Sequence, residues 1–224
     1  MSYFPRQLAL ALDHAESYAR DDFLSGPSNA ATLALVERWP DWPTRSVALV
    51  GPQGAGKSHL AAIWAEISGA RFLAGRALEG ADLPGSLATG ALVIEDAAAA
   101  TGDERALFHL LNLAREEEAF VLLTSSVAPA AWPVQIRDLG SRLRALPVVT
   151  LMPPDDALLR AVIVKLCADR HLAVDESFVA YLVTRIERSF AAARDAVLAL
   201  DHEALRQQRP LTRALAVEMF GASS

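Results

Sequence analysis

One short run of residues has the composition and spacing of a phosphate-binding loop. Residues 51–59 read Gly-Pro-Gln-Gly-Ala-Gly-Lys-Ser-His and match the pattern G-x-x-x-x-G-K-[ST], directly after the apolar run Val47–Val50. In this pattern backbone N–H groups face phosphate oxygens, the lysine neutralises the β and γ phosphates, and the serine binds Mg²⁺. An apolar helix expected over Leu60–Ile67 adds its positive N-terminal end. These neighbours argue against a glycine-rich turn that binds nothing. The candidate ligands are Gly51, Gly54, Ala55, Gly56, Lys57, Ser58 and His59, of which the histidine is expected to cap or pack against the loop.

Two acids follow the apolar run Ala91–Ile94. In P-loop proteins an acid at the end of a neighbouring strand holds Mg²⁺ or its water, and an adjacent acid orients the attacking water. The usual order is Asp then Glu, whereas here Glu95 precedes Asp96. We therefore expect Glu95 at the Mg²⁺ position and Asp96 at the water-positioning one, with slow hydrolysis as a consequence. The alternative is that both acids only solvate the end of a strand.

Hydroxyls and arginines mark the later part of the same region. Residues 124–126 are Thr-Ser-Ser at the end of an apolar run, where the hydroxyls, including that of Ser126, can sense a γ phosphate. The segment 136–144 then carries Arg137, Arg142 and Arg144. An arginine that projects outward can complete a neighbouring molecule's nucleotide site and stabilise charge on the transferring phosphoryl group. Taken alone, such arginines are more often solvated or paired with acids.

The elements that must position these residues form an α/β pattern followed by a helical one. Short apolar runs alternate with helical periodicity up to about Thr150, which predicts a parallel sheet flanked by helices. After Pro153-Pro154 the pattern is helical without a strand. This predicts an N-terminal arm over residues 1–20, an α/β nucleotide-binding domain over 21–152 and an α-helical domain over 153–224. The expected strands are Val47–Val50, Arg71–Leu73, Ala91–Ile94, Val121–Thr124 and Val148–Leu151, and the expected helices are Asn29–Arg38, Leu60–Ile67, Glu104–Glu118, Asp155–Asp169, Asp175–Arg188, Ala191–Arg206 and Thr212–Phe220.

Composition limits the classes of function. The 224 residues leave room for one or two cores and no further catalytic domain. A net charge of -6 and a pI near 5.4 argue against a dedicated, sequence-specific DNA-binding surface. The single cysteine, Cys167, lies in an apolar stretch and is expected to be a buried structural thiol, as in a reducing cytoplasm. Neither a membrane span nor a secretory leader is recognisable, so a cytoplasmic protein without membrane contact is expected.

The motifs, in this order and spacing, resemble the AAA+ ATPases and, among them, the DnaA branch. Residues 22–29 resemble the adenine-side F-x-x-G-x-S-N segment, residues 122–126 the sensor 1 strand, and residues 140–143 the arginine-bearing box. The resemblance implies a P-loop AAA+ sandwich with a helical lid that binds ADP or ATP, with Phe23 and Asn29 on the adenine side. It also implies that Arg142 acts in trans as an arginine finger, with Arg137 as the alternative. Because few residues follow the lid, we expect the helix-turn-helix DNA-binding domain of DnaA to be absent.

The N-terminal residues 7–12, Gln-Leu-Ala-Leu-Ala-Leu, resemble the Q-L-x-L-x-L peptide that docks on the DNA polymerase sliding clamp. Gln7 can hydrogen-bond at a pocket rim while Leu8, Leu10 and Leu12 enter apolar pockets; the alternative is an ordinary amphipathic segment that packs on the core. With this peptide and a DnaA-like core, the chain resembles the Hda family, whose members turn off DnaA after initiation. The resemblance implies a clamp-docked protein that stimulates ATP hydrolysis by DnaA, has weak ATPase activity of its own and is compatible with a homodimer.

The lid departs from the DnaA pattern at one position. The sensor 2 arginine is replaced by Ala191, and Arg188 and Arg194, each about one turn away, are candidates to substitute for it. The alternative is that both are surface charges. Two rival functions remain open: an autonomous AAA+ ATPase that acts as a loader or remodelling factor, and a small-molecule P-loop kinase. The kinase lacks support because the helical domain follows the sheet and no substrate-lid motif is visible.

Overall fold

The chain forms a five-stranded parallel sheet and a separate group of helices. The structure, a computed structural model, describes residues 18–221. The sheet has the order β2-β3-β4-β1-β5, and every neighbouring pair is parallel. This confirms the predicted α/β fold class, and each predicted strand is present within one or two residues at either end. The strands are β1 Ser46–Val50, β2 Arg71–Ala74, β3 Ala91–Glu95, β4 Phe120–Ser125 and β5 Val148–Thr150.

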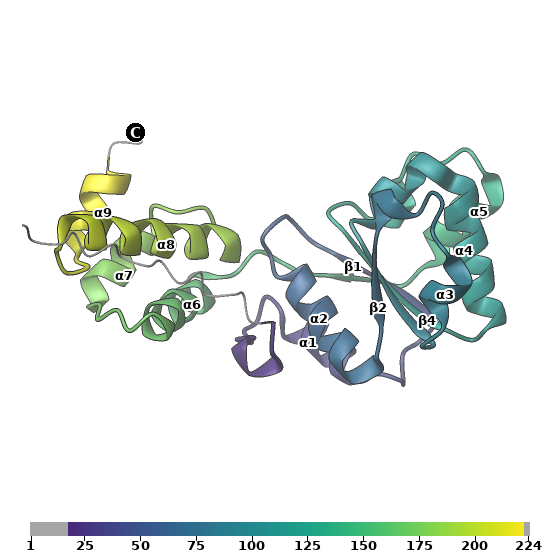
Figure 1. Cartoon of the computed structure of the whole chain (residues 1–224), viewed down its shortest axis with the longest axis horizontal. Helices are drawn as coiled ribbons and strands as arrows, with labels where there is room; N and C mark the ends of the chain where they lie inside the picture. The colour runs from purple at the N-terminus through teal and green to yellow at the C-terminus, as the bar shows by residue number, and fades with distance from the viewer. Residues whose placement is uncertain (1–17, 222–224) are drawn as a thin grey trace, which may run out of the picture.

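Helices cover both faces of the sheet (Figure 1). Successive side chains of a strand point to opposite faces, so Val93 of β3 joins one apolar cluster while Leu92 and Ile94 join the other. The first cluster lies under α1 (Ala30–Glu37) and α2 (Lys57–Ser68). The second lies under α3 (Leu83–Leu87), α4 (Glu104–Glu116) and α5 (Arg137–Ala145). Burial on both faces explains why the three central strands, β1, β3 and β4, are continuous apolar runs rather than alternating ones.

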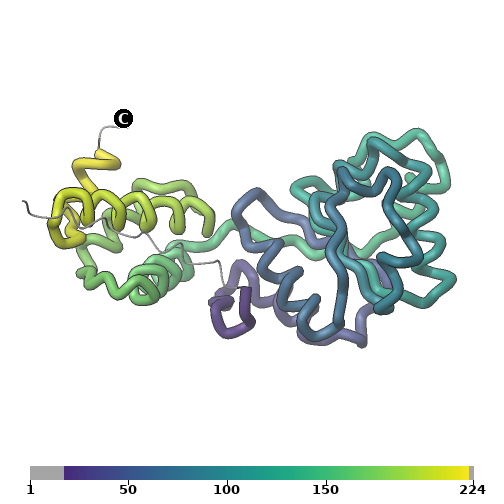
Figure 2. The backbone as a smooth tube through the Cα atoms, in the orientation of Figure 1, coloured from purple at the N-terminus to yellow at the C-terminus, as the bar shows by residue number. Residues whose placement is uncertain are grey.

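The remaining helices form a separate group, the lid (Figures 1 and 2). Their buried side chains make an apolar cluster of their own. The helices are α6 Asp156–Asp169, α7 Glu176–Val183, α8 Phe190–Gln207 and α9 Arg213–Phe220. Each begins after a side chain that accepts a hydrogen bond from a backbone N–H three residues on, which stabilises a helix start by about 1 kcal/mol. These caps are Asp155, Asp175, Ser189 and Thr212. No helix within residues 18–221 is long and apolar enough to cross a membrane.

The predicted helix Asp175–Arg188 is too long at its C-terminal end. α7 ends at Val183, where the hydroxyl of Thr184 donates a hydrogen bond back to the carbonyl of Tyr181 at 2.7 Å. The backbone at Ser189 is extended, because this residue is the N-cap of α8. The polar stretch between the two helices therefore forms a turn instead of a further helical turn.

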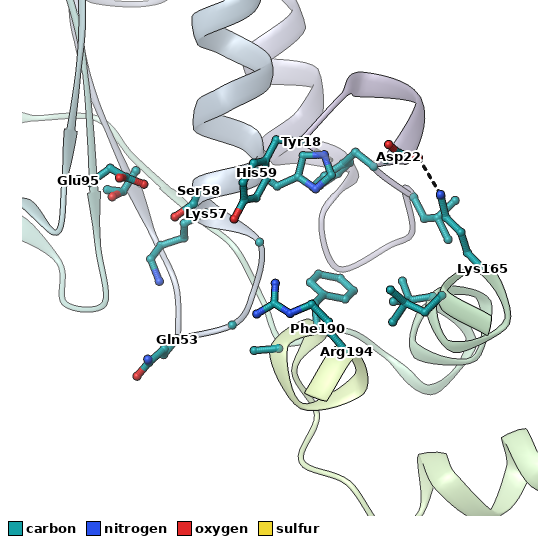
Figure 3. Close-up of a pocket in the computed structure, with 18 of the residues that line it drawn as sticks. Tyr18, Asp22, Gln53, Lys57, Ser58, His59, Glu95, Lys165, Phe190 and Arg194 are labelled. Atoms are coloured by element: carbon teal, nitrogen blue, oxygen red, sulfur yellow. Dashed lines mark ion pairs between the residues drawn. The ribbon is translucent and has the colours of Figure 1, made fainter. Parts of the chain in front are cut away.

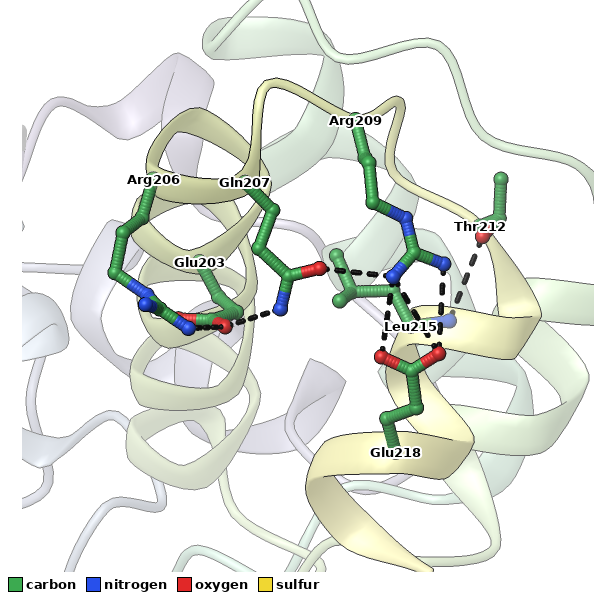
Figure 4. A network of polar contacts seen from close by, with 7 residues as sticks. All are labelled: Glu203, Arg206, Gln207, Arg209, Thr212, Leu215 and Glu218. Carbon is green, nitrogen blue, oxygen red and sulfur yellow. Dashed lines mark hydrogen bonds and ion pairs between the residues drawn. The ribbon is translucent and has the colours of Figure 1, made fainter.

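A polar network joins α8 to α9 (Figure 4). Arg209 donates to the side-chain oxygen of Gln207 at 2.8 Å and pairs with Glu218 at 3.3 Å. Earlier on α8, Glu203 accepts from Arg206 and Gln207. These donors lower the pKa of the Glu203 carboxyl to about 2. The network fixes the turn between the two helices at the end of the lid.

Cys167 should be unreactive in the folded protein. The side chain is 0% exposed on α6, which confirms the predicted buried thiol, and burial raises its pKa from 9.0 to about 11. Only the thiolate reacts, so a shift of this size lowers the reactive fraction about 100-fold near pH 8. We expect almost no reaction with a disulfide reagent, followed over time by absorbance, until guanidinium unfolds the chain. A full equivalent reacting within minutes without denaturant would contradict this.

Because the folded state favours the neutral thiol, its contribution to stability is complete below pH 9 and is lost as the pH rises toward 11.

Candidate functional site

The glycine-rich loop leaves β1 in a geometry that only glycine allows. A Cβ on Gly51 would lie 2.5 Å from the carbonyl oxygen of Leu151, so a side chain at this position would collide with backbone. Gly54 and Gly56 have φ values of 73° and 98°, in the left-handed region. Helix α2 then begins at Lys57 with a glycine N-cap that offers no side-chain acceptor to its first N–H groups. Such free donors at a helix N-terminus suit an anion.

Lys57 lies across this loop (Figure 3). Its ammonium donates to the carbonyl oxygens of Gly51 at 2.7 Å and Pro52 at 2.9 Å. Burial lowers the pKa of Lys57, and the negative charge of Asp96 opposes that shift. A phosphate bound at the loop would supply the counter-charge that this partly desolvated cation lacks.

The two acids are placed beside the loop by the strand order. β4 lies between β1 and β3, so its end separates the loop from Glu95 and Asp96. Asp96 has φ 48° and ψ 52°, a left-handed conformation that costs about 1 kcal/mol outside glycine, and its N–H donates to the hydroxyl of Thr124 at 3.1 Å. A Cβ on Gly75 would lie 2.4 Å from the carbonyl oxygen of Asp96, so glycine is required there as well. The acid is thus held by neighbouring elements in a conformation that it does not prefer.

An aromatic cluster forms the side of the site away from the sheet (Figure 3). The ring of His59 meets those of Tyr18 and Phe23 edge to face, with centroids 5.4 and 5.1 Å apart. The Nε2 atom of His59 lies 3.0 Å from the carbonyl oxygen of Ala19. His59 therefore joins α2 to the segment that precedes α1. This arrangement provides an apolar wall for a flat ring.

The lid touches the loop directly. The N–H of Phe190, the first residue of α8, donates to the carbonyl oxygen of Gly54 at 2.9 Å. The Cβ of Ala191 lies only 2.9 Å from where a Cβ on Gly54 would stand. The position of the expected sensor 2 arginine is therefore held by an alanine that lies against the loop and lines the cavity.

The two substitute arginines lie in different places. Arg194 lines the cavity between loop and lid, whereas Arg188 pairs with Asp156 at 2.9 Å and has a side chain 63% exposed. Lys165 of α6 connects lid and core, because its ammonium lies 2.7 Å from Asp22 and 2.8 Å from Asp169. The hydrogen bonds that Lys165 donates to these two carboxylates raise its pKa. The structure thus brings Arg194, and not Arg188, to the cavity.

These parts enclose one cavity of about 1010 Å³ between sheet and lid. Most of the residues predicted from sequence line it: Phe23, Gly54, Gly56, Lys57, Ser58, His59, Glu95, Asp96, Ser126 and Arg194. Gly51 and Ala55 shape the loop behind it. Asn29 is 1% exposed and holds its own segment, since its oxygen accepts from the N–H of Gly26 at 2.8 Å and its amide donates to Leu24 at 3.0 Å.

Sequence reasoning missed much of the lid side of the cavity. Further lining residues are Tyr18, Asp22, Gln53, Val162, Lys165, Leu166, Asp169, Arg170 and Phe190. Most lie on a helix more than a hundred residues from the loop, or in the segment before α1, and no motif marks them. The clamp-type peptide, with Gln7, Leu8, Leu10 and Leu12, lies outside the described residues.

The arginine-bearing segment forms α5 at the end of the sheet domain away from the lid (Figure 1). The guanidinium of Arg142 lies 5.4 Å from the ring centroid of Phe108 on α4. Arg142 is half-buried, whereas Arg137 is exposed. Neither arginine lines the cavity of its own chain. Any nucleotide that they contact must therefore belong to another molecule.

The sheet order, the loop after β1 and the helical lid define an AAA+ fold. In sequence, the chain is 31% identical over 176 residues to the chromosomal replication initiator protein DnaA of Caulobacter sp. (strain K31), covering 64% of this chain and 34% of that protein. The chain thus spans about a third of the length of this curated relative. No protein-family model matches the chain.

Solved structures agree on the fold. Domain III of Thermotoga maritima DnaA superposes with a TM-score of 0.74 at 19% identity, covering 91% of this chain and 95% of that one. AMPPCP-bound DnaA from Aquifex aeolicus gives 0.69 at 18% identity, covering 85% and 68%. The RuvB branch migration motor of Thermotoga maritima gives 0.68 at 14% identity, covering 90% and 70%. The chain is therefore DnaA-like in sequence and AAA+ in fold, as its motifs predict.

Proposed function

We propose that this chain is a nucleotide-bound AAA+ regulator that docks on the DNA polymerase sliding clamp and stimulates ATP hydrolysis by DnaA, so that initiation of chromosome replication is restrained. The observation that carries the proposal is the position of Arg142, on a helix remote from the chain's own cavity and aimed at no phosphate of its own. Such an arginine serves a nucleotide held by a partner. DnaA is the proposed partner because this chain is itself similar to DnaA in sequence.

The cavity supports a bound adenine nucleotide, ADP or ATP. The loop and Lys57 would hold the phosphates, and the aromatic wall around Phe23 and His59 would contact the base. Ser58 and Glu95 line the same cavity and would hold Mg²⁺, which binds through few protein oxygens when phosphates supply the others. The structural neighbour from Aquifex aeolicus, which has the same fold, is described as AMPPCP-bound.

The lid supports a structural role for that nucleotide rather than fast turnover. Ala191 lines the cavity but brings no charge to the phosphates. Arg194 of α8 lines the cavity and would be the arginine that substitutes for sensor 2, whereas Arg188 lies before α8 and pairs with Asp156. In this proposal residues 1–20 are the clamp-binding arm, 21–152 the nucleotide-binding domain and 153–224 the lid, and the protein acts in the cytoplasm.

The decisive experiment measures ATP turnover by DnaA with clamp-loaded DNA, in the presence and absence of this protein. We expect stimulation that requires both the clamp and the DNA. Brisk turnover by this protein alone, without any effect on DnaA, would favour an autonomous loader or remodelling ATPase instead.

The clamp motif makes a separate prediction. Replacing Gln7 and Leu10 with alanine should weaken clamp binding at least about 30-fold, since anchor residues of an interface are each worth about 2 kcal/mol or more. Affinity for ADP should not change. Clamp binding is measured by fluorescence anisotropy with labelled protein.

Ala9→Ser and Ala11→Ser provide the matched control, because they alter the same peptide at the positions between the anchors. Equal clamp affinity in all of these variants would remove the peptide from the proposal.

A further inference from the structure

The side chain of Arg142 rests on an aromatic ring rather than in open solvent. Its guanidinium carbon lies 5.4 Å from the ring centroid of Phe108, within the range of a cation–π contact. Phe108 is itself half-buried and packs against the apolar cluster under α4 and α5. The ring is therefore held by the core on one side and carries the arginine on the other.

A second contact fixes α5 on the same helix. Glu104, one turn before Phe108 on α4, accepts hydrogen bonds from the N–H of Gln135 at 2.8 and 2.9 Å and from the N–H of Ile136 at 2.8 Å. These are the last two residues before α5 begins. The carboxylate thus satisfies the last two N–H groups before α5 and lies at the positive end of the α5 dipole. Two residues one turn apart on α4 therefore contact α5: Glu104 contacts its start, and Phe108 contacts Arg142.

The inward side of α5 completes the support. Leu139 and Leu143 are 0% and 1% exposed and pack in the same cluster as Phe108. Leu143 is buried next to Arg142, so the arginine leaves the helix at the border between core and surface. Its backbone cannot rotate without exposing those leucines.

We propose that Phe108 is a positioning residue for Arg142, which keeps the guanidinium on the outer edge of α5 before a partner nucleotide arrives. This inference rests on the proposed function. A free arginine side chain samples many rotamers, and each must be given up when it enters a transition state. An arginine already resting on a ring loses less of this freedom. Arg137, which is exposed, has no such ring contact within residues 18–221.

The test uses the full-length protein with the clamp on DNA and ATP–DnaA. Phe108→Leu keeps an apolar side chain of similar volume and removes the ring, while Phe108→Tyr keeps the ring. At saturating protein, Phe108→Leu should lower the stimulated hydrolysis rate about two- to fivefold, which is the strength of an exposed cation–π contact, and Phe108→Tyr should not. The concentration of this protein that gives half-maximal stimulation should be the same in both variants.

A spectroscopic measurement on the folded protein tests the ring contact directly. The NMR signal of the Arg142 Nε–H proton is assigned by its disappearance in Arg142→Lys. It should be shifted upfield by the ring current in the wild-type protein and in Phe108→Tyr, and not in Phe108→Leu. This measurement on the wild-type protein holds even if Phe108→Leu folds poorly.

The outcomes are distinct. Unchanged or faster stimulation by Phe108→Leu, while Arg142→Ala loses stimulation, would overturn the positioning role and leave the proposed function intact. Absence of the ring-current shift in the wild-type protein would also overturn it. If Arg142→Ala itself keeps full stimulation, the assignment of the finger fails, and the role of Phe108 fails with it.

Discussion

Replacing Arg142 with alanine should lower the stimulated rate of ATP hydrolysis by DnaA about 10³- to 10⁵-fold, or to the unstimulated rate if that is reached first. This is the range typical of an arginine that stabilises a phosphoryl-transfer transition state. The loss should be in the rate at saturation, because the guanidinium acts on charge that develops during the reaction. Binding to the clamp and to ADP should be unaffected, since α5 is remote from the cavity. Arg142→Lys should also fail, because an ammonium lacks the planar fork of donors that matches phosphate oxygens.

Arg137→Ala is the matched control for this prediction. It removes the same charge from the same helix, five residues earlier and on an exposed position. We expect it to retain most of the stimulation. If Arg137→Ala loses stimulation and Arg142→Ala does not, the two arginines exchange roles. Melting temperatures of both variants show whether either change damages the fold.

Replacing Lys57 with alanine should weaken ADP binding about 100-fold, since charge-assisted hydrogen bonds contribute about 1.5 to 3 kcal/mol each. The ammonium now bonds to two loop carbonyls and is partly buried, so it is already held where the phosphates would lie. Calorimetric titration with ADP measures the change. As a second measurement, ADP should raise the melting temperature of the wild-type protein far more than that of the variant.

Lys165→Ala provides a matched control within the same cavity. It removes one positive charge from the lid side and breaks the ion pair with Asp22, but leaves the loop intact. Its effect on ADP affinity should be clearly smaller than that of Lys57→Ala. If both variants lose the same ADP affinity, the nucleotide is held by the total positive charge of the cavity and not by the geometry of the loop.

Local patterns were enough for the class of fold and for half of the site. Val47–Val50 and Ala91–Ile94 are continuous apolar runs because strands of a covered parallel sheet are buried on both faces, and such runs are visible in sequence. The loop at 51–58 is recognisable because its glycines are required by backbone geometry at fixed spacing. In contrast, α5 is not predicted from sequence, since it is only nine residues long and Gly140 and Ser141 near its middle are poor helix formers.

The chain's order of residues thus settles which local elements form and which of them carry phosphate-binding chemistry, because backbone geometry and side-chain periodicity act over a few residues. The tertiary structure decides what depends on packing between distant segments: that β4 separates the loop from the acids, that Ala191 lies against Gly54, and that Arg142 rests on Phe108. These contacts join residues separated by 34 to 137 positions in the sequence, as the numbers of Phe108 and Arg142 and of Gly54 and Ala191 show. No local pattern encodes such a contact, because it arises only when separate hydrophobic clusters bury their surfaces together.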